Sequence, residues 1–250
     1  QKKNAFIKHG QARKTVLDSL TEPATPLNIN DLAKARALLH LVRELEDGDF
    51  KVYLQPRGGL DYFSRDAEKA KAQLAAVTAL MDDIEPGDDS SPQIIHVVSY
   101  SEGFALADPD IVNESIKITR HALSSYRALR ASGGIEDMTS NQQVLARTSS
   151  LIKDARMAMA AIESSISSPY SAEGLYEIMS SGFFAVPYLS ECRDEFPDAT
   201  HWKTKCVNGA IEVVDELGIP TLAKDRIEVA AETAHIHADS LKRGIHSDPG

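Results

Sequence analysis

Apolar and polar residues recur along this chain with two periods, and each period predicts a kind of element. Apolar residues three and four positions apart are typical of amphipathic helices. Two short runs rich in β-branched and aromatic residues, 50–54 and 93–99, instead predict strands. Residues around Gly209, near 202–214, predict a small hairpin. The helical pattern covers residues 31–47, 66–84, 109–131, 138–167 and 172–180, and it resumes at residue 222.

The order strand–helix–strand–helix, with a polar loop after each strand, predicts parallel βα units and an α/β fold. The second strand is nearly continuous in β-branched residues, Ile94–Ile95 and Val97–Val98, as in a strand that is covered on both faces. The pattern changes after Gly133–Gly134, beyond which long helical stretches dominate. We therefore divide the chain into residues 1–132, with the βα units, and residues 133–250, a mainly helical part that contains the hairpin.

Polar residues follow both predicted strands. The loop Gln55–Phe63 combines a glycine pair, an arginine, an aspartate and two aromatic residues, and Ser99–Glu102 follows the second strand. Because α/β proteins bind ligands at the carboxyl ends of parallel strands, the two loops predict a shared ligand face. Glu102 would act there as a general base or bind hydroxyl groups; the alternative is a solvent-facing carboxylate at a helix entry. His96, inside the apolar strand, is expected to be a hydrogen-bonded core histidine.

Composition narrows the classes of function. The 250 residues carry a formal net charge of -10, which disfavours a broad nucleic-acid-binding surface. We see no apolar run of membrane length and no signal peptide, so no membrane contact is expected. Cys192 and Cys206 fit a reducing compartment, and we expect a cytoplasmic protein. His235 and His237 are only a pair, so we expect no metal bound directly by this chain.

Three segments of the chain resemble, in order and approximate spacing, the C-terminal half of one enzyme family. They are Leu60–Ala70, Val97–Glu102 and Gly182–Tyr188. The family is the large barrel subunit of adenosylcobalamin-dependent glutamate mutase (methylaspartate mutase). The similarity spans roughly residues 28–220, with an insertion around Gly87–Ser91.

The resemblance implies a fold and a reaction. The chain would supply the C-terminal βα units of a TIM-type (β/α)8 barrel, followed by the mainly helical extension. It would be a subunit or fragment of a cobalamin (vitamin B12)-dependent mutase, an isomerase that catalyses a radical carbon-skeleton rearrangement of an amino acid or related acid. The protein would position the radical and exclude water, while adenosylcobalamin carries the chemistry. The expected partners are a small cobalamin-binding subunit, a chain carrying the upstream barrel strands, and a small-molecule substrate.

The resemblance also implies cofactor-binding residues. Glu102 matches the glutamate that holds the adenosyl ribose, and Tyr100 lies in the same motif. Phe63 matches an aromatic residue that lines the same pocket, and Leu106 falls near a further lining position. Pro187 matches a proline in the loop that lies against the corrin ring. No catalytic residue is assigned.

The chain departs from the family pattern at Val98, where the family has a lysine, and it lacks the cobalamin signature Asp-x-His-x-x-Gly. The arginines that grip the substrate carboxylates come from earlier strands of the family's barrel. The substrate is therefore left open. Two other functions remain: a barrel enzyme with a different small ligand, and a non-catalytic assembly or interaction subunit. The polar loops favour the first of these, and the long helices with an acidic surface favour the second.

Overall fold

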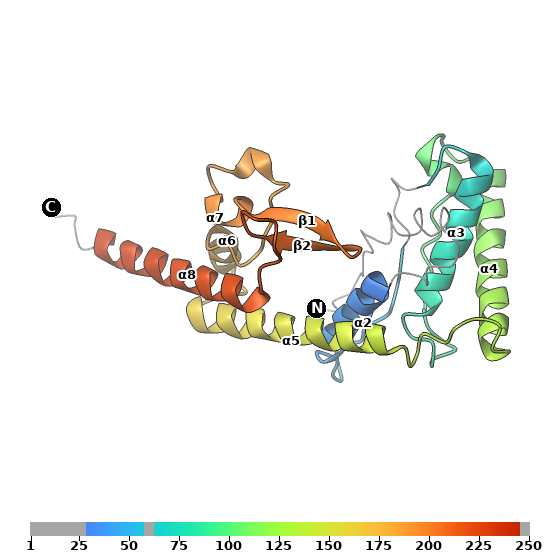
Figure 1. Ribbon diagram of the computed structural model, residues 1–250, viewed down its shortest axis with the longest axis horizontal. Coiled ribbons are helices and arrows are strands. Elements are labelled where there is room, and N and C mark those ends of the chain that lie inside the picture. The colour runs from blue at the N-terminus through green and yellow to red at the C-terminus, as the bar shows by residue number, and fades with distance from the viewer. Residues whose placement is uncertain (1–28, 58–62, 246–250) are drawn as a thin grey trace. The chain divides into compact units, whose positions relative to one another are not determined.

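A computed structural model describes residues 29–57 and 63–245 of the chain (Figure 1). The chain divides into two compact units: unit 1 extends to Ile152 and unit 2 begins at Lys153, inside helix α5. The α-helices are α2 (Ile29–Arg43), α3 (Ala67–Asp82), α4 (Pro109–Ala131), α5 (Gln142–Ser165), α6 (Ala172–Ser180), α7 (Pro197–Thr200) and α8 (Ala223–Ile245). Two 3-10 helices, η2 (Tyr100–Gly103) and η3 (Ser190–Cys192), and two strands, β1 (Lys203–Val207) and β2 (Ala210–Val214), complete the elements.

The fold class predicted from the sequence is wrong. The structure is 55% helix and 6% strand, and the described residues contain one sheet, the antiparallel pair β1–β2. They therefore do not form the βα units of a TIM-type barrel. The reason lies in how the two β-branched runs are buried: Val52 and Leu54 are buried while Tyr53 between them is exposed, and Ile94 is also exposed. These segments are covered on one face, whereas barrel strands are covered on both.

The two runs nevertheless lie side by side as extended chain. A single parallel bridge joins Arg57 to His96. The Ile94 N–H donates to the Leu54 carbonyl at 3.3 Å, and the His96 N–H donates to the Pro56 carbonyl at 3.2 Å. The pattern thus predicted extended, parallel segments correctly, but it overestimated how far their pairing extends. Gly58–Tyr62, in the loop that follows the first segment, lie outside the described residues.

The helical predictions are confirmed. Helix α4 matches the predicted range, because Asp108 caps its first turn and Pro109 occupies a position where no N–H is needed. The hairpin is confirmed as well: Asn208 and Gly209 both have positive φ, 49° and 78°, which is the conformation of a tight two-residue hairpin turn. None of the helices among the described residues is both long and apolar enough to cross a membrane.

Helices α3 and α4 of unit 1 pack against each other in parallel, as contacts at both ends show. Near their beginnings Lys71 pairs with Glu114, and near their ends the Tyr126 hydroxyl donates to Asp83. One apolar cluster lies between α3 and the extended segments, and a second joins α2 to α3 and to the start of α5. The second cluster is built from Leu32, Ala33, Ala35, Leu39, Val52, Leu54, Leu80, Ile84, Met138 and Val144.

The carboxyl end of α3 carries a buried charge cluster. Asp82 accepts from the Arg127 Nε at 2.7 Å and forms an ion pair with Arg130 at 2.8 Å, and Arg130 also donates to Asp83 at 2.9 Å. Burial raises the pKa of Asp83, although the Tyr126 hydroxyl and Arg130 oppose the shift. Two arginines thus compensate two buried carboxylates, so we interpret the cluster as the contact that holds α3 against α4.

Unit 2 has its own core. The second half of α5, helix α6 and helix α8 contribute Ile162, Ile166, Ile178, Phe183, Ile227, Ala230 and Ala234. Gly174 allows α6 to approach the preceding turn, because a Cβ there would lie 1.9 Å from the Ser168 carbonyl oxygen. The segment between α6 and η3 places Phe183 in this core and leaves Pro187 half-buried.

Candidate functional site

The turn η2 follows the second extended segment and places Glu102 at the surface of unit 1. Ser99 begins the turn, and its side chain accepts from the Ser101 N–H at 3.3 Å. The Ser99 and Ser101 hydroxyls lie 3.1 Å apart, and the Ser101 hydroxyl donates to the Ala105 carbonyl at 3.2 Å. These bonds fix a short polar turn where the apolar pattern ends, as the sequence predicts.

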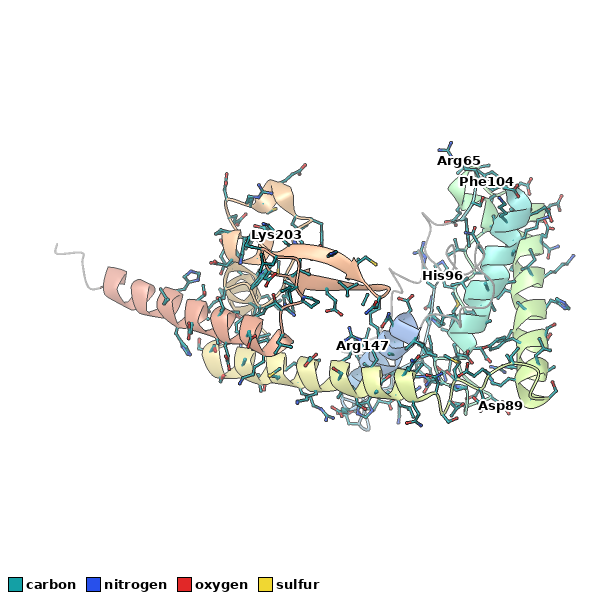
Figure 2. The ribbon with its side chains drawn as sticks, in the orientation of Figure 1. Arg65, Asp89, His96, Phe104, Arg147 and Lys203 are labelled. Atoms are coloured by element: carbon teal, nitrogen blue, oxygen red, sulfur yellow. The ribbon has the colours of Figure 1, made fainter. Side chains whose placement is uncertain are left out.

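Gly103 fastens the turn to the segment before α3. A Cβ at this position would lie 2.6 Å from the carbonyl oxygen of Phe63, so no larger residue fits without a backbone shift. Phe104 follows the turn, at the same end of unit 1 as Arg65 (Figure 2). The close approach places the Phe63 backbone next to the turn that carries Glu102. The sequence pattern predicted that these two loops lie close together.

Tyr100 anchors the turn to both helices. Its ring is buried, and its hydroxyl donates to Glu114 at 2.6 Å. Lys71 donates to the same carboxylate at 2.8 Å and lies 5.2 Å from the tyrosine ring centroid. The hydrogen bond to Glu114 raises the pKa of Tyr100, and the bond from Lys71 lowers the pKa of Glu114. We interpret Tyr100 as a positioning residue for the turn.

A small hollow of about 180 Å³ opens beside Glu102. The residues with polar side chains that line it are Glu102, Ser99 and Ser115, the last from α4. Ser115 donates to the Ile111 carbonyl at 2.8 Å, which fixes its oxygen. The described residues place no hydrogen-bond partner on the Glu102 carboxylate. The walls are apolar, formed by Val97, Ala107, Val112 and Ile116.

This arrangement suits part of a ligand that carries hydroxyl groups. A carboxylate only accepts hydrogen bonds, so its natural partner is a donor such as a pair of neighbouring hydroxyls. The volume lies below the 300–1,000 Å³ or so that complete small-molecule sites occupy, so we expect a fragment the size of a sugar ring rather than a whole cofactor. The residues present therefore fit the ribose of an adenosyl group.

The remaining predicted site residues lie in different surroundings. Phe63 is only 8% exposed and packs in the apolar cluster with Tyr100, so its ring supports the turn. Leu106 is 98% exposed and does not line the hollow. Pro187 belongs to unit 2. Their assignments to a cofactor stay predictions.

Two residues of the site differ from what the sequence suggested. Ser115 was missed; the available signal was a polar residue on the apolar face of α4, between Ile111 and Thr119. His96 was expected in the core, but it is exposed on the extended segment, with Nδ1 3.5 Å from the Gln55 amide (Figure 2). The prediction for His96 is wrong because the second segment is covered on one face only.

Among the described residues, no group of three histidine, cysteine, aspartate or glutamate side chains could hold a metal ion. Comparison of the chain with known protein families and with curated proteins finds no match. The resemblance to the large subunit of glutamate mutase therefore stays a prediction, and the function has to be argued from the site.

Proposed function

We propose that unit 1 binds the ribose of an adenosyl group through Glu102, as part of a cobalamin-dependent mutase assembly. The observation that supports the proposal is a carboxylate that has no hydrogen-bond partner among the described residues, on a residue that lines a hollow of about 180 Å³ together with Ser99 and Ser115. The resemblance to the glutamate mutase family around Glu102 is the reason for assigning this ribose to adenosylcobalamin. The proposal does not involve a barrel.

Within the proposal each side chain has one task. Glu102 accepts hydrogen bonds from the 2′- and 3′-hydroxyls, while Ser99 and Ser115 line the hollow beside it. Tyr100 and Gly103 hold the turn in place. Adenosylcobalamin, held mainly by a small partner subunit, would supply the radical that starts the rearrangement of a small acid. The substrate is an amino acid or a related acid.

Glu102→Gln tests the ribose contact. Losing a charge-assisted hydrogen bond costs about 1.5–3 kcal/mol, so we expect adenosine to bind at least about tenfold more weakly to the variant. Affinity is measured by saturation-transfer NMR on the 250-residue chain. The matched control is Asp49→Asn, which removes an exposed carboxylate elsewhere in unit 1. The control ligand is 2′,3′-dideoxyadenosine, which lacks both hydroxyls. It should bind weakly, and with the same affinity to the Glu102→Gln variant and to the unaltered chain.

Equal adenosine affinity in the Glu102→Gln variant and the unaltered chain would contradict the assignment. The mutase assembly is tested by adding adenosylcobalamin and a small cobalamin-binding subunit. The proposal predicts a change in the visible spectrum, and Glu102→Gln should reduce it.

A second candidate function, a non-catalytic assembly subunit, is favoured by the exposed apolar side chains of unit 1. Tyr53 is 57% exposed and Ile94 49% exposed on the extended segments. Isolated exposed apolar residues are common, but these two lie on neighbouring extended segments joined by the bond from the Ile94 N–H to the Leu54 carbonyl, a surface that suits a protein contact. Normal complex assembly after changing both polar loops, with no effect of adenosine or cofactor, would favour this function.

A further inference from the structure

Unit 2 carries a second and larger hollow, unrelated to the Glu102 site. Its volume is about 690 Å³, within the range of small-molecule sites. Four parts of unit 2 form it: the end of α6 with Met179, the segment 183–189, Val213 of β2 and Arg226 of α8. Apart from the hydroxyl of Tyr188, the side chains of the segment that line the hollow are apolar, and Arg226 is the one charged residue in the wall.

The segment 183–189 is held in place rather than lying loosely over the core. Gly182 has a φ of 80°, and a Cβ there would lie 2.6 Å from the Asp198 carbonyl oxygen. Further along, the Val186 N–H donates to the Ala199 carbonyl at 2.8 Å. Between these attachments Phe184 stays half exposed, and Tyr188, after the second of them, is 76% exposed. The hollow is thus a formed apolar surface that the described residues leave open.

Arg226 supplies a cation that unit 2 only partly compensates. Its Nε is buried and has no hydrogen-bond partner among the described residues. The guanidinium lies 5.9 Å from the ring of Trp202, whose own Nε1 is likewise buried and unpartnered. Burial lowers the pKa of Arg226, while Glu212 and Asp154 act in the opposite direction. Leaving a buried donor unsatisfied is costly, so two adjacent ones indicate a missing acceptor.

We propose that this hollow binds an apolar carboxylate, with its hydrocarbon body against the segment 183–189 and its carboxylate on Arg226. An apolar wall with one placed polar group is the usual composition of a small-molecule site. Arginine binds a carboxylate through parallel N–H···O bonds from its guanidinium, which makes Arg226 the natural partner for the ligand's charge. The single charge and the scarcity of other polar groups in the wall favour a monocarboxylate over a sugar or a nucleotide.

Trp202 provides the measurement, because it is the only tryptophan of the chain. Its fluorescence is titrated with decanoate, below the concentration at which decanoate forms micelles, and with the neutral decanamide. We expect saturable binding of decanoate and binding about 10- to 100-fold weaker for decanamide. Arg226→Gln should weaken decanoate binding by the same factor and leave decanamide unchanged. Lys224→Gln, an exposed charge on the same helix, is the matched control and should change neither.

Two further variants keep the test decisive. If Arg226→Gln does not fold, as judged by circular dichroism, Phe184→Ser replaces it, because this half-exposed side chain lines the hollow without belonging to the core. It should weaken decanoate and decanamide alike. Equal affinity for the two probes in the unaltered chain, or decanoate binding that neither variant reduces, would overturn the proposal. Glu102→Gln should leave decanoate binding intact, which separates this site from the one in unit 1.

Discussion

One carboxylate, that of Glu114, ties the candidate turn to unit 1 through Tyr100 and Lys71. The bond from Lys71 is the largest cause that lowers the pKa of Glu114 from its ordinary value of 4.5. A carboxyl group whose pKa is lower in the folded than in the unfolded protein stabilises the fold above the unfolded pKa. That stabilisation is lost as the pH falls through the folded pKa.

We therefore expect Glu114→Gln to be less stable than the unaltered chain at pH 7, with a difference that shrinks as the pH falls below about 4.5. Urea unfolding midpoints of both proteins, measured from pH 7 downward, check this. Lys71→Met in the Glu114→Gln background is the control, because it should add little once the carboxylate is gone. A difference that stays constant over the pH range would show that Glu114 acts by packing alone.

Single residues also show which parts of the candidate site can be predicted from the sequence. Glu102 could be placed, because an apolar run that ends in polar residues marks the end of an extended segment. Ser115 could not be placed, because its hydroxyl reaches the hollow only through the packing of α4 on α3. The Phe63 ring packs in the apolar cluster with Tyr100, and its role as a cofactor-pocket residue stays a prediction. Local pattern thus located the turn, and long-range packing decided which side chains face the hollow.

Helix α4, like α6, has the bounds that the sequence predicts, and its start lies beside the candidate site. The Asp108 side chain accepts from the Ile111 N–H at 2.8 Å. Removing such a cap costs about 1 kcal/mol, so Asp108→Ala should lower the free energy of unfolding by that amount. It should also weaken adenosine binding, because Val112 and Ser115 follow within two turns.

Asp108→Asn is the matched control, since asparagine caps a helix about as well as aspartate. Urea unfolding and the adenosine titration are run on both variants. If Asp108→Ala and Asp108→Asn behave alike in both measurements, the cap does not set the position of the first turn.

The two extended segments show why other elements could not be predicted in full. A β-branched run reports that a segment is extended and at least half buried, but it does not report how many neighbours it pairs with. The bridge between Arg57 and His96 is one pair, and the described residues add no further strand to it. Caps and turns are local, so α4 and the hairpin were predictable, whereas sheet size depends on partners far along the chain.

At the scale of the whole molecule, each apolar cluster of the described residues lies within one of the two units that divide at Ile152. The two clusters of unit 1 end at Leu151, and the cluster of unit 2 begins at Met157. A unit with its own core can unfold as its own cooperative step. Trp202, the only tryptophan, lies in unit 2, so its fluorescence reports that unit separately from the circular dichroism of the whole chain.

Arg130→Ala tests this separation. Arg130 pairs with both Asp82 and Asp83, and its removal leaves two buried carboxylates short of a partner in unit 1. Breaking a buried pair costs about 3–5 kcal/mol, so the circular dichroism transition of unit 1 should move to much lower urea. The fluorescence transition of Trp202 should not move, and Arg120→Ala, an exposed charge on the same helix, should change neither. If the two cores are independent, a loss of stability in unit 1 leaves the urea midpoint of Trp202 fluorescence unchanged. A Trp202 midpoint that falls together with the circular dichroism midpoint in Arg130→Ala would therefore show that the two units unfold as one.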